Sequence, residues 1–116
     1  LFFSIMAVLY KSAAIDLTTT NLTTVLTINT SAYAIVKTVQ ASHEAASNVD
    51  VDLYLKKSGG SDTEISHAQL NKEFINMLSN TLNLEAGDVI KMQADTADTI
   101  TGFVSYALVN REDQNG

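Results

Sequence analysis

The sequence predicts an all-β protein, a β-sandwich or jelly-roll-like fold of seven to nine antiparallel strands. Extended runs that alternate apolar with polar residues, or are rich in β-branched residues, recur at intervals of roughly ten residues, with turn-forming residues between them. No long helix is required. The chain contains no proline, so every backbone N–H can join a sheet ladder. Its 116 residues have the size of one domain, which we expect to span residues 1–116.

The first predicted strand begins in an apolar amino-terminal segment, residues 1–10, and continues through residues 12–17. The segment is too short for a transmembrane helix, which needs about 20 residues, and it lacks the positive region of a secretory signal. Met6 resembles a natural translation start, in which case the preceding residues come from an upstream non-AUG start or from how the gene was delimited. If ordered, the segment must lie against the protein's own core or a neighbouring subunit. Residues 1–9 are therefore a candidate inter-subunit arm.

Two further strands follow a polar, threonine-rich loop. Residues 22–28 are rich in β-branched side chains, and residues 33–41 form the next apolar run after an Asn-Thr-Ser turn. In this second run, simple alternation places Ile35 and Val39 on one face and Val36 on the other.

The clearest half-buried strand is residues 49–56, in which Asp50 and Asp52 occupy the polar side. A glycine-containing hairpin turn at residues 57–62 leads into a returning strand at residues 63–69.

The segment between residues 71 and 80 has no clear period. Leu70, Phe74 and Met77 recur at helical spacing, yet Phe74 and Ile75 fit a strand equally well. We expect a short irregular or single-turn connection here.

Residues 82–94 indicate strand, tight turn and strand, with Gly87 and Asp88 forming the turn. A last strand is predicted at residues 100–109. The final residues, 111–116, are expected to be a polar tail.

The charge balance excludes two classes of partner. The chain has 7 basic and 13 acidic residues, a net charge of −6, distributed along the sequence. Nucleic acids and anionic membranes both require a basic patch, so we expect neither as a partner. The absence of cysteine excludes disulfides and thiolate metal sites.

No residue set predicts catalysis, a metal site or a cofactor. His43 and His67 are expected in solvated loops, without the further ligands that a structural zinc site needs. Asp50 and Asp52 are explained by a polar strand face, which we favour over calcium binding. The chain has no Gly-x-Ser-x-Gly elbow, and its glycine pair lacks the lysine and helix of a phosphate-binding loop.

Exposed aromatic and apolar side chains are the remaining candidates for function. Several together on one sheet face would mark a contact between subunits, so we expect a homo-oligomer. The candidate interface residues are Phe2, Phe3, Ile5, Val8, Tyr10, Tyr54 and Phe103.

Short phrases across residues 7–109 resemble the small virion structural proteins of tailed bacteriophages, especially those that infect cyanobacteria. These phrases are Tyr10–Thr20, Ala34–Gln40, Val51–Leu55, Leu84–Ile90 and Val104–Tyr106.

The resemblance implies a β-sandwich that assembles in many copies on the virion, formed in the host cytoplasm. The expected function is a capsid decoration (cement) protein that binds the major capsid protein. The alternatives are a tail, neck or fibre-base adaptor that contacts other virion proteins and, more remotely, a carbohydrate-binding module.

Overall fold

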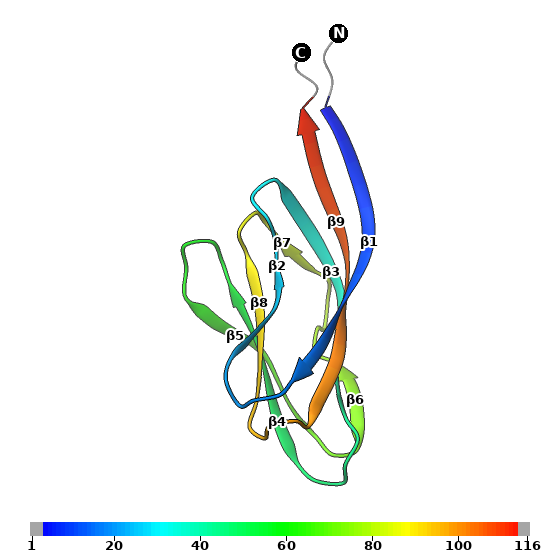
Figure 1. The fold of residues 1–116 in the computed structure, drawn as a ribbon, viewed down its shortest axis with the longest axis vertical. Helices are drawn as coiled ribbons and strands as arrows, with labels where there is room; N and C mark the ends of the chain where they lie inside the picture. Colours follow the sequence, from blue (N-terminus) through cyan, green and yellow to red (C-terminus); the bar gives the residue numbers. More distant parts are fainter. Residues whose placement is uncertain (1–3, 114–116) are drawn as a thin grey trace.

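The computed structural model describes the backbone of residues 4–113 and the side chains of residues 8–110. Within residues 4–113 it contains strands and no helix, which confirms the predicted all-β class (Figure 1). None of the described segments forms a helix able to cross a membrane. The strands are β1 (Ser4–Leu17), β2 (Thr23–Thr27), β3 (Ala32–His43), β4 (Val49–Lys56), β5 (Asp62–Leu70), β6 (Glu73–Asn76), β7 (Leu82–Leu84), β8 (Val89–Ala94) and β9 (Ile100–Asp113).

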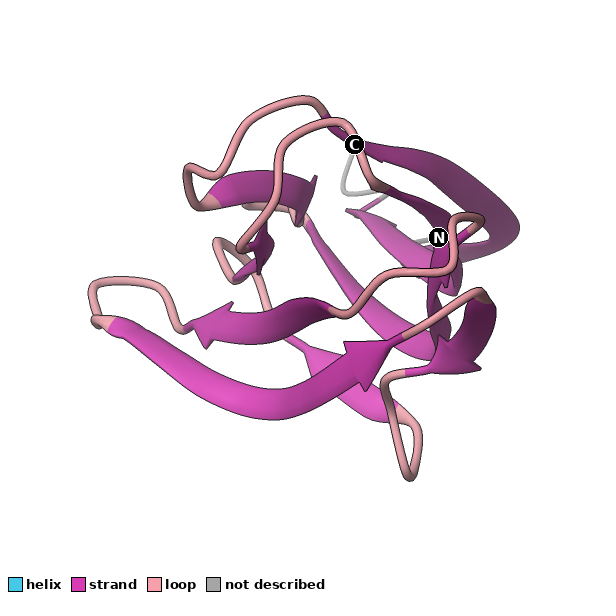
Figure 2. Cartoon of the chain, turned by 90° about the horizontal axis from the view of Figure 1, so that it is seen from below, coloured by secondary structure: helices cyan, strands magenta, loops and turns pink. Residues whose placement is uncertain are grey.

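The strands form two antiparallel sheets. The first, sheet A, has the order β1-β9-β3-β6, with β7 also paired to β3; the second, sheet B, has the order β2-β8-β4-β5. Figure 2 looks along the long axis and shows the two layers, made of strands and loops alone. The predicted sandwich is therefore confirmed.

Alternation along the strands fills the space between the sheets. In β4, Val51 and Leu53 are fully buried, and Ile90 and Met92 of β8 are buried beside them. Val36 of β3 is also buried, in sheet A. Each such side chain contributes about 1.5–3 kcal/mol of burial free energy, which holds the layers together.

A β-bulge in β3 changes which side chains face outward. The register against β9 shifts between Val36 and Thr38. Strict alternation would place Ile35 and Val39, which are four positions apart, on the same face. Instead, Ile35 is exposed and Val39 is buried. The predicted common face for these two residues is wrong, because the extra residue of a bulge reverses the alternation beyond it.

The tight turn at Gly87 and Asp88 is confirmed, but its two strands belong to different sheets. Gly87 has a φ of 83°, a conformation that favours glycine. The buried carboxylate of Asp88 accepts hydrogen bonds from the backbone N–H of Glu85 at 2.8 Å and of Ser58 at 3.0 Å, and from the Lys57 ammonium. Asp88 therefore links the crossing between the sheets to the β4–β5 hairpin.

The expected irregular segment at residues 71–80 contains a strand instead. β6 pairs antiparallel with the last residues of β3, and Phe74 is 69% exposed, so the helical spacing was misleading. At the end of β6, the Asn76 side chain accepts the N–H of Val39 at 3.1 Å, and the N–H of Met77 donates to the Val39 carbonyl at 2.8 Å. These long-range bonds stabilise a four-residue edge strand.

β1 and β9 form a two-stranded ribbon that projects from the sandwich (Figure 1). The pairing runs from Leu17 opposite Ile100 to Ser4 opposite Asp113, so β9 continues past the tail boundary expected at Arg111. The remaining tail residues, 114–116, lie outside the described residues.

Closer to the body, β9 passes tightly beside β3. A Cβ atom on Gly102 would lie 1.8 Å from the carbonyl oxygen of Gln40, so only glycine fits at this position.

Candidate assembly surface

The outer face of sheet A carries an apolar patch next to the projecting ribbon. Here two sets of residues are paired side by side across β1, β9 and β3, and all of their outward side chains are apolar or aromatic. The first set is Val8, Val109 and Tyr33, and the second is Tyr10, Ala107 and Ile35. We call these residues the apolar patch.

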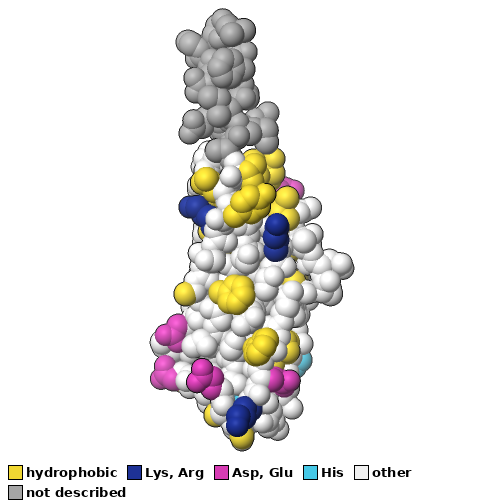
Figure 3. All heavy atoms as spheres, turned by 90° about the vertical axis from the view of Figure 1, so that its right-hand side faces the viewer, with side chains coloured by type: hydrophobic (Ala, Val, Ile, Leu, Met, Phe, Trp, Pro, Cys, Tyr) yellow, Lys and Arg dark blue, Asp and Glu magenta, His cyan; other side chains and the backbone are white. Residues whose placement is uncertain are grey.

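The patch is closely packed at its centre and exposed at its margins. Val109 and Ala107, on the central strand β9, are only 5% exposed because larger neighbours flank them. Tyr10 is 77% exposed, and the ammonium of Lys37 lies 5.1 Å from the centroid of its ring. Figure 3 shows hydrophobic side chains gathered towards the end where the ribbon projects, with basic side chains beside them. A contiguous patch of this kind is typical of a protein contact.

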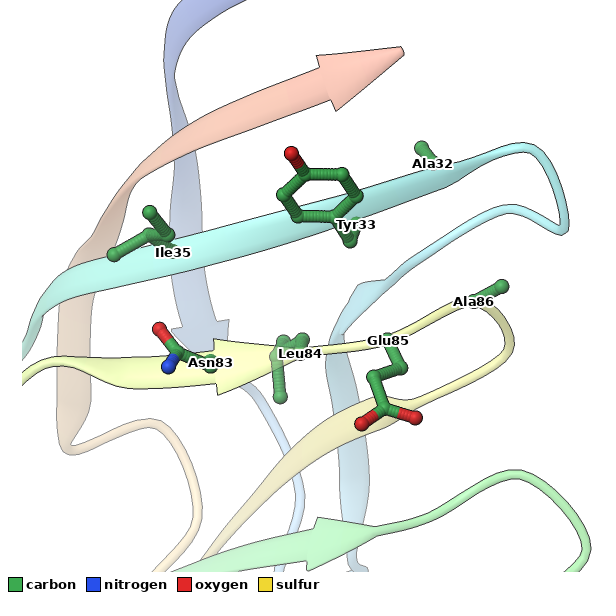
Figure 4. A pocket seen from close by; sticks show the side chains of 7 residues that line it. All are labelled: Ala32, Tyr33, Ile35, Asn83, Leu84, Glu85 and Ala86. Carbon is green, nitrogen blue, oxygen red and sulfur yellow. The ribbon is translucent and has the colours of Figure 1, made fainter. Parts of the chain in front are cut away.

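A groove continues the patch past the edge of β3. It measures about 470 Å³ and lies between Tyr33 and Ile35 on one side and Leu84 with the following turn on the other (Figure 4). β7 is short, so a neighbouring protein can reach both the groove and the patch. The remaining lining residues are Ala32, Asn83, Glu85 and Ala86.

The outer face of sheet B is acidic. On β4, Asp50 and Asp52 point outward as predicted, and β5 adds Glu64 and Asp62. Lys91 neutralises one of these groups, because its Nζ lies 3.0 Å from Asp62 Oδ1.

Tyr54 lies among these carboxylates. Partial burial raises the pKa of its phenol, and the charges of Asp52 and Glu64 raise it further. The tyrosine therefore lies in acidic surroundings, unlike the tyrosines of the apolar patch.

The structure divides the predicted interface residues between the two faces. It brings Val8 and Tyr10 together, and it places Phe103 on the same outer face of sheet A, opposite Ala14 and Gln40. Tyr54 lies on sheet B instead.

The predicted interface residues nearest the amino terminus lie outside the residues whose side chains the structure describes. Ile5 has its backbone opposite Glu112, and its side chain is not described. Phe2 and Phe3 lie outside the described residues.

Sequence reasoning missed Tyr33 and Ile35. Because the bulge lies beyond them, simple alternation placed Ile35 on the same face as Val39, which the structure shows to be buried. The available signal was the alternation of Ala32, Ala34 and Val36 within the first half of the strand.

The prediction of solvated loop histidines is wrong for His43, which is buried, and for His67 it is right about exposure but wrong about the loop. His43 ends β3 and is 3% exposed; its Nε2 lies 2.9 Å from the carbonyl oxygen of Ser47, and its Nδ1 lies 3.2 Å from that of Thr99. His67 lies on β5, opposite Asp52, with which it forms an ion pair when protonated.

Comparisons with known proteins concern the fold. No protein-family model matches the sequence, and no curated protein matches it. A chain in the acidic stable capsid structure of Helicobacter pylori bacteriophage KHP30 aligns over 100% of both chains, with 10% identity and a TM-score of 0.59.

A chain of the Bacillus endospore appendages, described as disulfide-linked pili, aligns over 91% of this chain and 89% of its own length, with 12% identity and a TM-score of 0.50. A pentameric capsid protein from metagenomic phage sequences aligns over 80% of this chain and 66% of its own length, with 14% identity and a TM-score of 0.43. At these identities the first two alignments establish a likeness of fold alone.

Proposed function

We propose that this chain is a non-enzymatic virion structural protein, a capsid decoration protein that binds the major capsid shell through the outer face of sheet A. The observation that carries the proposal is the apolar patch, which faces away from an acidic opposite side. Burial of its exposed side chains against a shell would contribute about 1.5–3 kcal/mol per large residue before the costs of association. Many copies of such a modest contact reinforce a shell by avidity.

The fold comparison supports this proposal. The full-length alignment with a chain of a phage capsid structure shows that this fold, with no additional domain, occurs in a capsid component. The resemblance of the sequence to small phage virion proteins points in the same direction.

The candidate arm, residues 1–9, overlaps the projecting ribbon. Residues 4–9 pair with β9, and β1 lies at the edge of sheet A, so its outer backbone groups can pair with a strand of a neighbouring subunit. In this proposal the ribbon and the apolar patch contact the same neighbour.

A matched pair of substitutions tests the proposal. Ile35 is 36% exposed on sheet A, and Ile65 is 39% exposed on sheet B, so Ile35→Asp and Ile65→Asp add the same charge at equally exposed sites. Binding is measured by co-sedimentation with shells assembled from the major capsid protein of the same genome. We expect Ile35→Asp to weaken binding at least about tenfold and Ile65→Asp to change it less than about twofold. Equal binding by the two variants would exclude sheet A as the contact.

Deletion of residues 1–9 tests the candidate arm and also removes Val8 of the apolar patch, whereas deletion of residues 1–7 keeps Val8 and tests the ribbon separately. Either truncated chain should fold, because among residues 8–110 the first buried core side chain is Ile15, but it should bind shells more weakly. Electron microscopy of labelled virions then distinguishes copies over the whole shell, which indicate decoration, from copies at one vertex, which indicate a tail, neck or fibre-base adaptor.

The fold similarity to the endospore appendage chain favours a second candidate, a subunit that associates with copies of itself. Sedimentation equilibrium of the isolated chain tests this. If the isolated chain forms homo-oligomers or filaments and the Ile35→Asp substitution dissociates them, the contact between copies involves the apolar patch.

A further inference from the structure

We propose that Asp52, Glu64 and His67 form a surface binding site for a divalent transition metal ion, with zinc as the favoured ion. The site lies on the outer face of sheet B, remote from the apolar patch, and is independent of the proposed function. One ligand atom from each residue lies within 4.8 Å of the other two.

A β-bulge in β5 creates this grouping. Glu64 and His67 are three positions apart, so in a regular strand their side chains would point to opposite faces. The register against β4 shifts between Leu53 and Tyr54: His67 lies opposite Asp52, and Glu64 lies opposite Tyr54. Both side chains therefore face outward beside Asp52, held by two paired strands rather than by a loop.

The donor set favours zinc over calcium or magnesium. It offers one imidazole nitrogen and carboxylate oxygens, the mixture that Zn²⁺ accepts in tetrahedral sites, whereas calcium and magnesium take oxygen ligands alone. Three protein ligands leave a fourth position for water or for a donor from a neighbouring molecule.

The site holds two carboxylates without a lysine partner. Among residues 8–110, the Lys ion pairs involve Asp62, Glu85 and Asp88, and His67 forms an ion pair with Asp52 only when it is protonated. The pKa of Glu64 is raised, first by its hydrogen bond with Asp52 and then by burial and the charge of that carboxylate. Like charges held this close are destabilising, and a bound dication would relieve their repulsion.

Protons compete with the metal at His67. The ring Nδ1 lies against Asp52 Oδ1, and this hydrogen bond raises the pKa of His67, with partial burial opposing the shift and the charges of Asp50, Asp52 and Glu64 adding to it. Asp62 with its partner Lys91 is a further charged pair near this face, and Asp95 lines the same hollow as Asp52 and His67. Zinc requires the neutral ring, so protons compete with the metal for the His67 nitrogen and zinc binding should weaken in acid.

The test uses the untagged full chain and zinc chloride in isothermal titration calorimetry. We expect one zinc ion per chain near pH 8 and at least about tenfold weaker binding near pH 5.5. His67→Ala and, as a second variant, Glu64→Gln should each weaken binding at least about tenfold. Gln69→Ala, on the same face of β5, is the matched control and should retain wild-type affinity.

Three outcomes would overturn the site. These are no zinc binding up to about 1 mM, unchanged affinity in His67→Ala, and equal affinity for calcium. Retained binding in His67→Ala would assign the zinc to other groups, such as His43. Because shell binding is a separate measurement, failure of the zinc site leaves the proposed assembly function unaffected.

Discussion

The outer faces of the two sheets differ in chemistry although they belong to one small sandwich. The face of sheet A is apolar around Tyr10 and Ile35, whereas the face of sheet B carries Asp50, Asp52 and Glu64. Four of the 13 acidic residues, Asp50, Asp52, Asp62 and Glu64, thus lie together on one face of the fold. If the apolar patch is the contact surface, as proposed, then adhesion and solubility belong to opposite faces of the sandwich.

The largest effect is expected from Gly102→Ala, which breaks the framework of sheet A. The new Cβ would lie 1.8 Å from the Gln40 carbonyl oxygen, so β3 and β9 must separate. We expect a loss of about 4 kcal/mol or more in the free energy of unfolding, measured by urea denaturation. Thr101→Ala, at the neighbouring exposed position, is the control and should cost no more than about 0.5 kcal/mol. A stable Gly102→Ala variant would contradict the close approach of the two strands.

The next largest effect is expected at Asp88, which links the crossing between the two sheets to the β4–β5 hairpin. Asp88→Ala removes the acceptor of several hydrogen bonds and leaves their donors unpaired, which should destabilise the fold by about 3 kcal/mol at neutral pH. Glu85→Gln, at an exposed side chain, is the control and should have little effect.

This second prediction has a defined pH dependence. Burial alone would raise the pKa of Asp88, but the hydrogen bonds from Lys57 and the backbone together outweigh it and lower the pKa. The stability that the ionised group contributes is therefore present above the ordinary carboxyl value, about 3.9, and is lost as the pH falls through the lowered value. The difference between wild type and Asp88→Ala should shrink on acidification, and a constant difference would argue against an ionised Asp88.

A smaller effect is expected within the apolar patch. Lys37→Ala removes the cation that lies over the Tyr10 ring and should reduce stability by about 0.5–1 kcal/mol. A double-mutant cycle with Tyr10→Leu isolates the interaction, and a coupling energy of zero would show that the contact has no energetic role.

The smallest expected effect is the salt dependence of shell binding, which distinguishes the apolar face of sheet A from the acidic face of sheet B. If sheet A carries shell binding, the affinity should change less than about twofold between roughly 0.05 and 0.5 M salt. Binding through the acidic face would weaken steeply over the same range. The co-sedimentation assay measures this directly, and a steep salt dependence would assign the contact to sheet B.

Much of the fold was predictable from local pattern. The alternation in residues 49–56 identified β4 and its outward Asp50 and Asp52, and the glycine-containing turns located the hairpin after β4 and the crossing before β8. β6 was not predictable, because a four-residue strand with an exposed Phe74 depends on hydrogen bonds to β3 rather than on its own sequence.

By itself, the sequence determined all the strands except β6, their spacing and the excess of acid, since these follow from residue type and short-range period. Only the tertiary structure decided which side chains meet. One bulge in β3 turns Ile35 outward beside Tyr10, and one in β5 brings Glu64 and His67 to the same face. A bulge is fixed by the ladder with the partner strand, so alternation counted along one whole strand misplaces the residues on one side of the bulge.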